Sequence, residues 1–488
     1  MERFLRHRFR RPTLAAIACA AFLLGVSAAG AGRFSLPHLF VFLGVVGLLR
    51  ARRQDVWVLI ALAWLGFCLG SWRGQAYAQR VHTYDGLFKK KAVFVGVAQA
   101  DAVYGARTQL TFTASSLQVL SPVREPLIGV VSVSGFGVPM VYRGDVVQMS
   151  GALYPTLGGN QAKLSFANLQ VIAHGGSWLD TVRRHFVAGV ESALPEPAAS
   201  FGLGLLIGQR STLPSDVSQQ LTMVGLTHII AVSGYNLTII LQVVRRLTAG
   251  RSKYQALVLF VTLIGGFVLL VGSSPSIVRA AIVSLLSIAA WYYGHEIKPL
   301  TLLLLAAAIT AYANPLYVWG NVSWYLSFLA FAGVMLLAPL VMKRFLGTAS
   351  PHILLSVLVE SLCAELLTLP YILHIFGQMS LVALVANVLV VALVPLAMLF
   401  TLAAGLAGTF AAAFAGWVAW PARLLLTYML DMAAALSRIP HAFLQNIGFS
   451  LGEMFAAYAA VAIFGLTLHR RAKRGIITDK KAEETKGV

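Results

Sequence analysis

The sequence predicts an α-helical, polytopic membrane protein with one small extracytoplasmic all-β domain that is OB-like. Three observations indicate this fold class. First, 58% of the 488 residues are hydrophobic and 11% are charged, whereas about a quarter of the residues in a soluble domain are charged. Second, apolar runs of bilayer length recur along the chain. Third, a polar stretch of alternating, β-branched segments interrupts these runs after the first few spans.

Apolar segments of about 17 residues or more mark the expected membrane spans, because a helix of that length crosses the hydrocarbon core. We expect about twelve crossings. A shorter apolar piece at residues 201–207 is expected to be a re-entrant or interfacial helix. The expected spans are residues 13–30, 34–49, 56–72, 227–247, 254–272, 277–293, 299–317, 320–342, 353–373, 381–408, 413–436 and 451–468.

Basic residues beside these segments predict the orientation. Cytoplasmic loops of membrane proteins carry an excess of Lys and Arg. If the segments cross in turn, all the basic clusters fall on one side, so both termini are expected in the cytoplasm and the β domain outside it. We assign about two thirds of the net charge of +20 to this bias, while the rest is compatible with nucleic-acid contact. The clusters lie at residues 3–11, 50–53, 245–253, 343–344 and 470–474.

Residues 74–175 read as the β domain. Five runs that start near residues 93, 108, 129, 146 and 163 alternate or are β-branched, and Gly, Pro and Asp separate them. Their number and spacing approach those of an OB fold. OB folds bind single strands through aromatic rings on a basic face, but a structural barrel with a solvated basic surface is an equal alternative. The candidate nucleic-acid contacts are Lys89, Lys90, Lys91, Arg107 and Arg143, with rings from Tyr104 and Phe112.

The chain is therefore expected to have five parts. Helical spacing of apolar residues at 178–194 predicts a helix along the outer membrane surface. The parts are residues 1–73 with the first spans, 74–175 with the β domain, 176–226 with amphipathic or interfacial helices, 227–470 with the main transmembrane domain, and a basic cytoplasmic tail at 471–488.

Several short motifs after the β domain carry a resemblance to a known family. GLGLLIGQRSTLP at 202–214 leads through GLTH at 225–228 to IIAVSGYN at 229–236. In this order, the motifs resemble the competence domain of the ComEC family, and the β domain looks like its extracellular module. The shared order carries the resemblance over nearly the whole chain, because each motif alone is weak. The later motifs are GSSPSIVRA at 272–280, WYLSF at 324–328, Glu365 with TLP at 368–370, His374, Phe376 with Gly377, Asn387 and Pro395.

The resemblance implies a channel of the bacterial inner membrane that passes single-stranded DNA into the cytoplasm during natural transformation. No enzymatic activity, catalytic residue, cofactor or metal is expected. The partners would be single-stranded DNA, the bilayer, and a DNA receptor and an ATP-driven motor in trans, since the sequence has no Gly-x-x-x-x-Gly-Lys-Ser/Thr loop. Many family members carry a metallo-β-lactamase-like nuclease domain that residues 470–488 do not provide, so we expect a separate nuclease. A homo-oligomer is left open.

Polar residues within the apolar segments are the candidate pore lining, because a polar side chain in a membrane is costly unless it faces a partner or a wet cavity. In such a pore, Arg279 would meet a phosphate or pair with Glu365. The alternatives are helix packing for His228 and Ser233, and a structural ion pair for Arg279 and Glu365. Arg210 joins the candidate DNA contacts of the β domain. The full pore-lining set is His228, Ser233, Asn236, Ser276, Arg279, Ser327, Glu365 and Asn387.

The sequence is compatible with two other functions. An intramembrane serine hydrolase could use Ser233 with His228, but the sequence offers neither an orienting acid nor a Gly-x-Ser-x-Gly motif. A permease for a small or lipid-linked solute would have a similar polar core, and its β domain would be a cap. Salt-dependent binding of oligonucleotides would separate a DNA channel from such a permease.

Overall fold

The computed structural model describes most of the chain. The expected span at 34–49, and all but the first residues of the span at 227–247, lie outside the described residues. The described residues are 11–30, 56–104, 109–121, 125–127, 129–138, 140–156, 159–175, 178–209, 212–230, 250, 252–272, 275–294, 298–345 and 353–486.

Helices stand where the apolar segments were predicted. The first two described helices are α2 (Arg11–Gly30) and α4 (Val56–Val81), and a 3-10 turn follows α4 at His82–Leu87. The helices after the β domain are α5 (Trp178–Ala193), α6 (Ala198–Ile207), α7 (Ser215–Met223), α8 (Thr227–Ile230), α10 (Lys253–Val271), α11 (Pro275–Tyr292), α12 (Pro299–Ala313), α13 (Leu316–Gly320), α14 (Val322–Ala332), a π-helical turn (Gly333–Leu337), α15 (Ala338–Phe345), α16 (Ile353–Phe376), α17 (Ala383–Val390), α18 (Val394–Phe410), α19 (Ala415–Ser437) and α20 (Leu451–Lys486).

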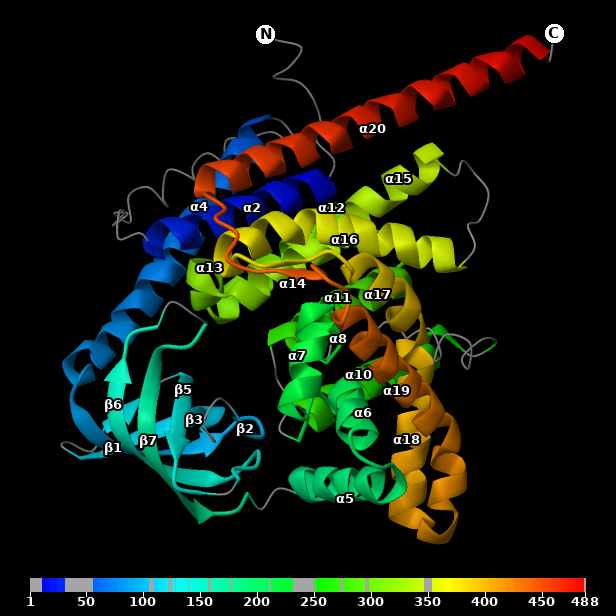
Figure 1. Cartoon of the computed structure of the whole chain (residues 1–488). Helices are drawn as coiled ribbons and strands as arrows, with labels where there is room; N and C mark the ends of the chain where they lie inside the picture. Colours follow the sequence, from blue (N-terminus) through cyan, green and yellow to red (C-terminus); the bar gives the residue numbers. More distant parts are fainter. Residues whose placement is uncertain are drawn as a thin grey trace.

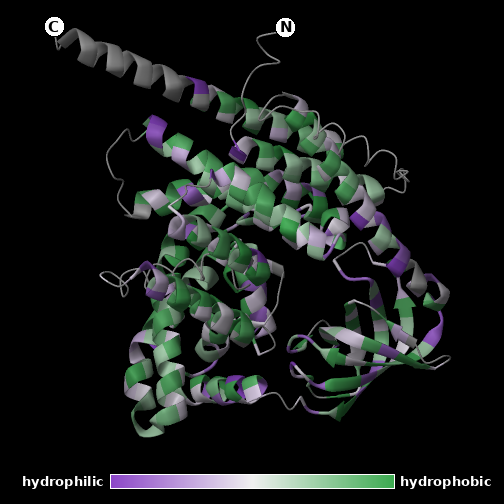
Figure 2. Ribbon diagram, turned by 180° about the vertical axis from the view of Figure 1, so that it is seen from behind, coloured by the Kyte–Doolittle hydropathy of each residue, from purple (hydrophilic) through white to green (hydrophobic). Residues whose placement is uncertain are grey.

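Six helical segments in the described part of the chain are long and apolar enough to cross a membrane. Helices α10, α11 and α12 are apolar but shorter, so the count of about twelve crossings stays a prediction. Figure 2 shows apolar residues spread over these helices, whereas the strands mix polar and apolar positions. The six segments are Arg11–Gly30, Trp57–Leu87, Val322–Phe345, Leu355–Phe376, Ala383–Phe410 and Leu451–Leu468.

Glycines bring α2 and α4 into close contact. A Cβ atom at Gly70 would lie 2.1 Å from the Phe22 carbonyl oxygen, and one at Gly25 would lie 2.1 Å from the Phe67 carbonyl oxygen. Gly66 and Gly70 form a small-xxx-small pair, which lets helix backbones approach in a membrane. In Figure 1, α2 and the upper part of α4 lie with α12, α14, α15, α16 and α20 above α5, α6, α7, α18 and α19.

The β module closes into a barrel. Its strand order is β1–β3–β5–β7–β6 and back to β1, and β5 with β7 is its parallel pair. The five predicted strands are confirmed, and two short strands join them. The strands are β1 (Lys91–Ala98), β2 (Val103–Tyr104), β3 (Leu110–Ser121), β4 (Glu125–Leu127), β5 (Val131–Phe136), β6 (Val146–Tyr154) and β7 (Ala162–Ala173).

Two expectations about this module differ from the structure. The ring of Phe112 is buried in the barrel core with Phe94 and Met149, so the prediction that it faces nucleic acid is wrong. Its neighbours Leu110 and Ala114 are buried too, since alternate residues of a strand share one face. The β module also begins later than residue 74. Helix α4 continues to Val81, and the first strand of the module starts at Lys91.

Helix α6 lies inside the helical part of the protein. All ten of its residues are buried, and they join one large core with residues of α18 and α19. A helix that is apolar on every side packs in an interior, so the interfacial position considered for residues 201–207 is wrong. At 1.5 Å per residue, ten residues reach only about 15 Å, too short to cross a bilayer.

Candidate functional site

A basic run opens the β module. Lys89, Lys90 and Lys91 are all exposed, and Lys89 takes a left-handed backbone conformation with φ of 61°. The Lys89 amide donates to the Leu153 carbonyl at 2.9 Å, which ties the run to the end of β6. Arg107, which was predicted to act with these lysines, lies outside the described residues, as does Arg210.

Exposed aromatic rings stand on the outer face of the barrel beside a further lysine. Tyr154 on β6 pairs with the exposed Lys163 on β7. Phe166, also on β7, is 79% exposed and has φ of 52°. On β5, Phe136 pairs with Asn168 of β7. Rings next to basic groups can stack nucleic-acid bases, and sequence analysis missed all three rings.

A bulge in β7 turns Phe166 outward. Leu164 is buried, so strict alternation would put Phe166 in the core. Instead, the register with β6 shifts between Ser150 and Ala152, and Ala167 takes the buried position. Gly135 makes room for it, because a Cβ atom there would lie 2.3 Å from the Ala167 carbonyl oxygen. Sequence periodicity carries no signal for this change of face.

Arg143 is engaged at the junction between the β module and the helices. Its Nε lies 3.7 Å from an Asp180 carboxylate oxygen on α5, and its Nη1 donates to the Leu269 carbonyl of α10 at 3.2 Å. Its backbone amide donates to Asp101 at 2.9 Å. These contacts serve the junction, so Arg143 is a weaker candidate for DNA than the exposed lysines.

Asp101 also binds a buried arginine of α5. The Arg183 Nη2 donates to the Asp101 carboxylate at 2.7 Å, and Arg183 is 8% exposed. Burial lowers the pKa of the Arg183 guanidinium, and the Asp101 charge opposes that shift. Removing one partner of such a buried pair leaves an uncompensated charge. The pair therefore fixes the junction between the module and α5, the lower junction.

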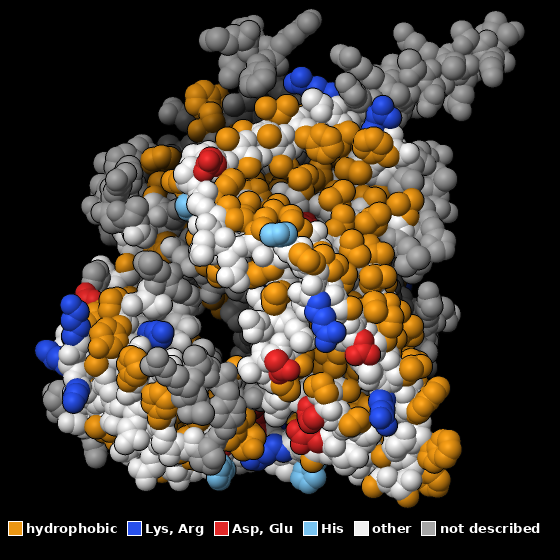
Figure 3. Space-filling view, in the orientation of Figure 1, with side chains coloured by type: hydrophobic (Ala, Val, Ile, Leu, Met, Phe, Trp, Pro, Cys, Tyr) orange, Lys and Arg blue, Asp and Glu red, His pale blue; other side chains and the backbone are white. Residues whose placement is uncertain are grey.

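A second junction, the upper junction, holds the opposite edge of the β module. The Gln161 amide donates to the Tyr77 hydroxyl near the end of α4, and the Asn314 amide donates to the Gly159 carbonyl at 3.3 Å. The module is therefore attached both to α5 and α10 and to α4 and the α12–α13 turn. Figure 3 shows an opening between the module and the helices, between these two attachments.

Arg279 lies buried between α11 and α14. Its Nη2 donates to the Ser276 hydroxyl at 3.0 Å and to the Ser323 carbonyl at 3.1 Å. Its Cζ lies 5.6 Å from the centre of the Phe328 ring. The structure thus brings Ser276 and Arg279 together, and Ser327 lies one turn beyond Ser323 on α14, on the same helix face.

Glu365 lies apart from Arg279. Both side chains are described, and no ion pair within 4.0 Å joins them, so the predicted alternative of a structural pair is wrong. Glu365 and Glu360 are half-buried on α16, and neither forms an ion pair with any basic side chain in the described part of the chain. Cys363, between them, packs against the π-helical turn, where a Cβ atom at Gly333 would lie 2.4 Å from the Cys363 carbonyl oxygen.

His228 and Asn387 lie on elements that meet where Gly225 contacts Ala383. The His228 Nδ1 lies 3.0 Å from the Gly225 carbonyl oxygen, and Gly225 packs on Ala383 at the start of α17. Asn387 follows one turn later on the same helix face, and its Oδ1 is buried without a hydrogen-bond partner among the described residues. Ser233 and Asn236, which were predicted to line the pore, lie outside the described residues.

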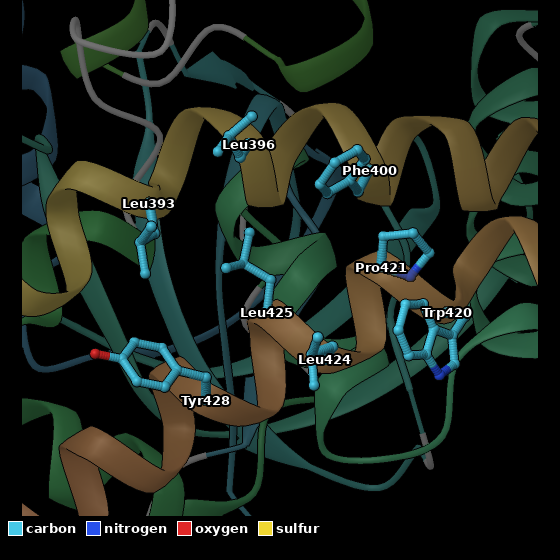
Figure 4. Close-up of a pocket in the computed structure, with 8 residues that line it drawn as sticks. All are labelled: Leu393, Leu396, Phe400, Trp420, Pro421, Leu424, Leu425 and Tyr428. Atoms are coloured by element: carbon cyan, nitrogen blue, oxygen red, sulfur yellow. The ribbon is translucent and has the colours of Figure 1, made fainter.

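A hollow of about 510 Å³ between α18 and α19 has an entirely apolar lining. Figure 4 shows Leu396 and Phe400 projecting from α18, and Trp420 and Leu424 from α19. Pro421 lies inside α19 at this point. Because no polar atom lines this hollow, it does not correspond to the polar conduit predicted from the sequence.

Comparison with known proteins identifies the family of the helical part of the chain. Residues 205–471, more than half of the chain, match the family described as Competence protein. The chain belongs to the Competence protein family. The matched segment contains α8, α11, α14, α16 and α17, and therefore every described candidate for the pore lining. Among described residues of the whole chain, no group of three or more His, Cys, Asp or Glu side chains could hold a metal ion.

A curated relative supports the Competence assignment. The chain is 25% identical over 276 residues to "ComE operon protein 3" of Bacillus subtilis (strain 168), which covers 54% of this chain and 34% of the relative. The match thus spans about a third of the length of that relative. No solved structure matches the chain significantly.

Proposed function

We propose that this Competence family protein conducts single-stranded DNA through the bacterial cytoplasmic membrane during natural transformation. The family match over residues 205–471 carries the proposal, and the apolar helices support a place in the membrane. Both termini would lie in the cytoplasm and the β module outside, as the positive-inside bias predicts. A receptor and an ATP-driven motor would act in trans.

The β module would receive the strand. A closed five-stranded barrel is compatible with an OB-type module, and such modules bind single strands by combining basic groups with rings on which bases stack. Lys89, Lys90, Lys91 and Lys163 would contact phosphates, and Tyr154 and Phe166 would stack bases. The two junctions would hold this surface in a fixed position beside the helices.

The strand would then enter the helical part of the protein. The opening seen in Figure 3 lies between the module and the helices. The polar residues of α11 and α14 would line the first part of the conduit, and the group around His228 and Asn387 would line a second part. Glu365, Ser233 and Asn236 remain predicted members of the lining.

Transformation of a strain that lacks the gene tests the proposal. We expect loss of transformation by single-stranded uptake, and recovery when the wild-type gene is supplied in trans. Correct membrane insertion of the supplied protein is verified by fractionation. Undiminished transformation in the deletion strain, in an organism without a second copy, contradicts the proposed function.

A permease for a small or lipid-linked solute is a second candidate. The half-buried, unpaired carboxylates of Glu360 and Glu365 favour it, because intramembrane acidic groups commonly mark ion and proton pathways. Binding of fluorescent oligothymidylate to the full-length protein separates the two functions. Phosphate contacts make DNA affinity fall steeply with salt, so salt-dependent binding supports the DNA channel, and failure to bind favours the permease.

A further inference from the structure

Arg279 is a buried charge without a counter-charge among the residues that the structure describes. It is 3% exposed, and its Nε and Nη1 have no hydrogen-bond partner among the residues that the structure describes. No described carboxylate forms an ion pair with it, and its Nη2 reaches only a hydroxyl and a carbonyl. A buried charge is costly unless it is paired and hydrogen-bonded, so the guanidinium can stabilise an anion.

The surroundings add to this positive charge. Ser276 lies in the first turn of α11, and Ser323 lies in the first turn of α14. The first turn of a helix carries free N–H groups and a partial positive charge. Arg279 bridges these two turns through one nitrogen, so two helix N-termini and the guanidinium meet at one place.

Arg73 shows the opposite arrangement in the same protein. Its Nε donates to the Tyr312 carbonyl at 2.9 Å and its Nη2 donates to the Ala313 carbonyl at 3.3 Å. Both carbonyls belong to the last turn of α12, the negative end of that helix. The charge of Arg73 is therefore compensated within the protein, whereas no described carboxylate or helix C-terminus compensates that of Arg279.

We propose that Arg279 and the N-terminal turns of α11 and α14 form an anion site that takes one phosphodiester group. A phosphodiester carries a single negative charge, which one guanidinium balances, and a free oxygen of it can accept a charge-assisted hydrogen bond from one of the two unpartnered nitrogens, Nε or Nη1. DNA and phospholipid headgroups both supply this group. Assignment of the DNA strand as the source rests on the proposed function, and a strand would then pass the site one phosphate at a time.

Thermal unfolding and binding of the full-length protein, purified in a maltoside detergent, test the site. The probes are oligothymidylate, the uncharged methylphosphonate analogue of the same length, and short-chain phosphatidylglycerol. The variants are Arg279→Gln, which removes the charge, Arg279→Lys, which keeps the charge but loses donors, and Arg73→Gln as a matched control. Without any probe, we expect Arg279→Gln to unfold at a higher temperature than wild type and Arg73→Gln at a lower one.

Binding gives the second readout. Because a hydrogen bond to a charged group is worth a factor of about ten to a hundred, Arg279→Gln should weaken oligothymidylate binding by about that factor, and Arg279→Lys by less. The methylphosphonate analogue should bind wild type and Arg279→Gln equally. The Arg73→Gln variant should retain the wild-type response to every phosphodiester probe.

The outcomes separate the site from the function. A rise in unfolding temperature that requires Arg279 and appears with phosphatidylglycerol but not with oligothymidylate supports the site and assigns lipid as its source, against passage of the strand. Wild-type protein that binds oligothymidylate, with Arg279→Gln identical to it in both readouts, overturns the site and leaves the proposed function standing. Destabilisation by Arg279→Gln to the same degree as by Arg73→Gln also overturns it.

Discussion

At the scale of single residues, two rings of the barrel occupy positions that sequence analysis did not predict, Phe112 and Phe166. The ring expected outside, Phe112, is in the barrel core, whereas Phe166 is exposed because of the bulge in β7. An exposed ring held in a left-handed backbone conformation is rare for a bulky residue. Such strain, where it is observed, supports a functional role for the side chain.

Replacement of this ring tests the role of the outer face. Phe166→Asn keeps a residue that tolerates the left-handed conformation but removes the stacking surface. Since stacking of one base on a ring is worth about 1–3 kcal/mol, we expect oligothymidylate affinity to fall about tenfold to a hundredfold, with little change in unfolding temperature. Ile172→Asn, at another exposed apolar position of β7, is the control and should bind like wild type.

At the scale of elements, apolar runs predicted the helices well because lipid and protein interior select the same residues. The ends of the elements were harder to predict from the sequence. The apolar run ends at Trp72, but α4 continues to Val81, since residues such as Gln75 and Gln79 favour a helix without being apolar. Strands β2 and β4 contain two and three residues, too few for a periodic pattern.

The contact between α2 and α4 depends on glycine. Gly70→Ala would place a methyl group 2.1 Å from the Phe22 carbonyl oxygen, and overpacking of this kind costs about 1–3 kcal/mol. We therefore expect a lower unfolding temperature for the purified protein. The control is Gly265→Ala in α10, where nothing lies within 4 Å of the new methyl group. An unchanged unfolding temperature in Gly70→Ala would show that the helices can separate freely.

At the scale of the whole molecule, the candidate site depends on contacts between distant segments. Sequence analysis selected Arg143 and Arg279 from their charge and position. Their partners, Asp180 and Ser323 respectively, come from other elements and leave no trace in local spacing. The same holds for Glu365, which lies on a helix next to Arg279 but does not reach it. Residue types were thus predictable, whereas their pairing required the fold.

The lower junction can be tested through its buried ion pair. Arg183→Gln leaves Asp101 without its charged partner, and loss of one partner of a buried pair costs about 3–5 kcal/mol. We expect faster hydrogen exchange of backbone amides in α5, measured on the full-length protein. Glu191→Gln, at an exposed position further along α5, is the control. Equal exchange in both variants would mean that the pair does not hold the module.

The upper junction can be locked covalently. A Cβ atom at Gly159 would lie 3.2 Å from Cγ of Asn321. This Cγ is one bond from the Asn321 Cβ, so the two Cβ atoms come near the separation of about 3.5–4.5 Å that a disulfide requires. The double variant Gly159→Cys with Asn321→Cys, made without the three native cysteines, should therefore form a disulfide under mild oxidation. Mass spectrometry of the non-reduced digest detects the cross-link. Free thiols at both positions after oxidation would place the two segments further apart.

Helix α4 is one continuous rod from its glycine contact with α2 to Tyr77 at the upper junction. With 26 residues at 1.5 Å each, it is about 39 Å long, and nothing in its sequence breaks it. The tilt of a membrane helix responds to the thickness of the surrounding hydrocarbon layer. A thicker or thinner bilayer would therefore change the tilt of α4, and this change would move the β module at its far end relative to the membrane surface.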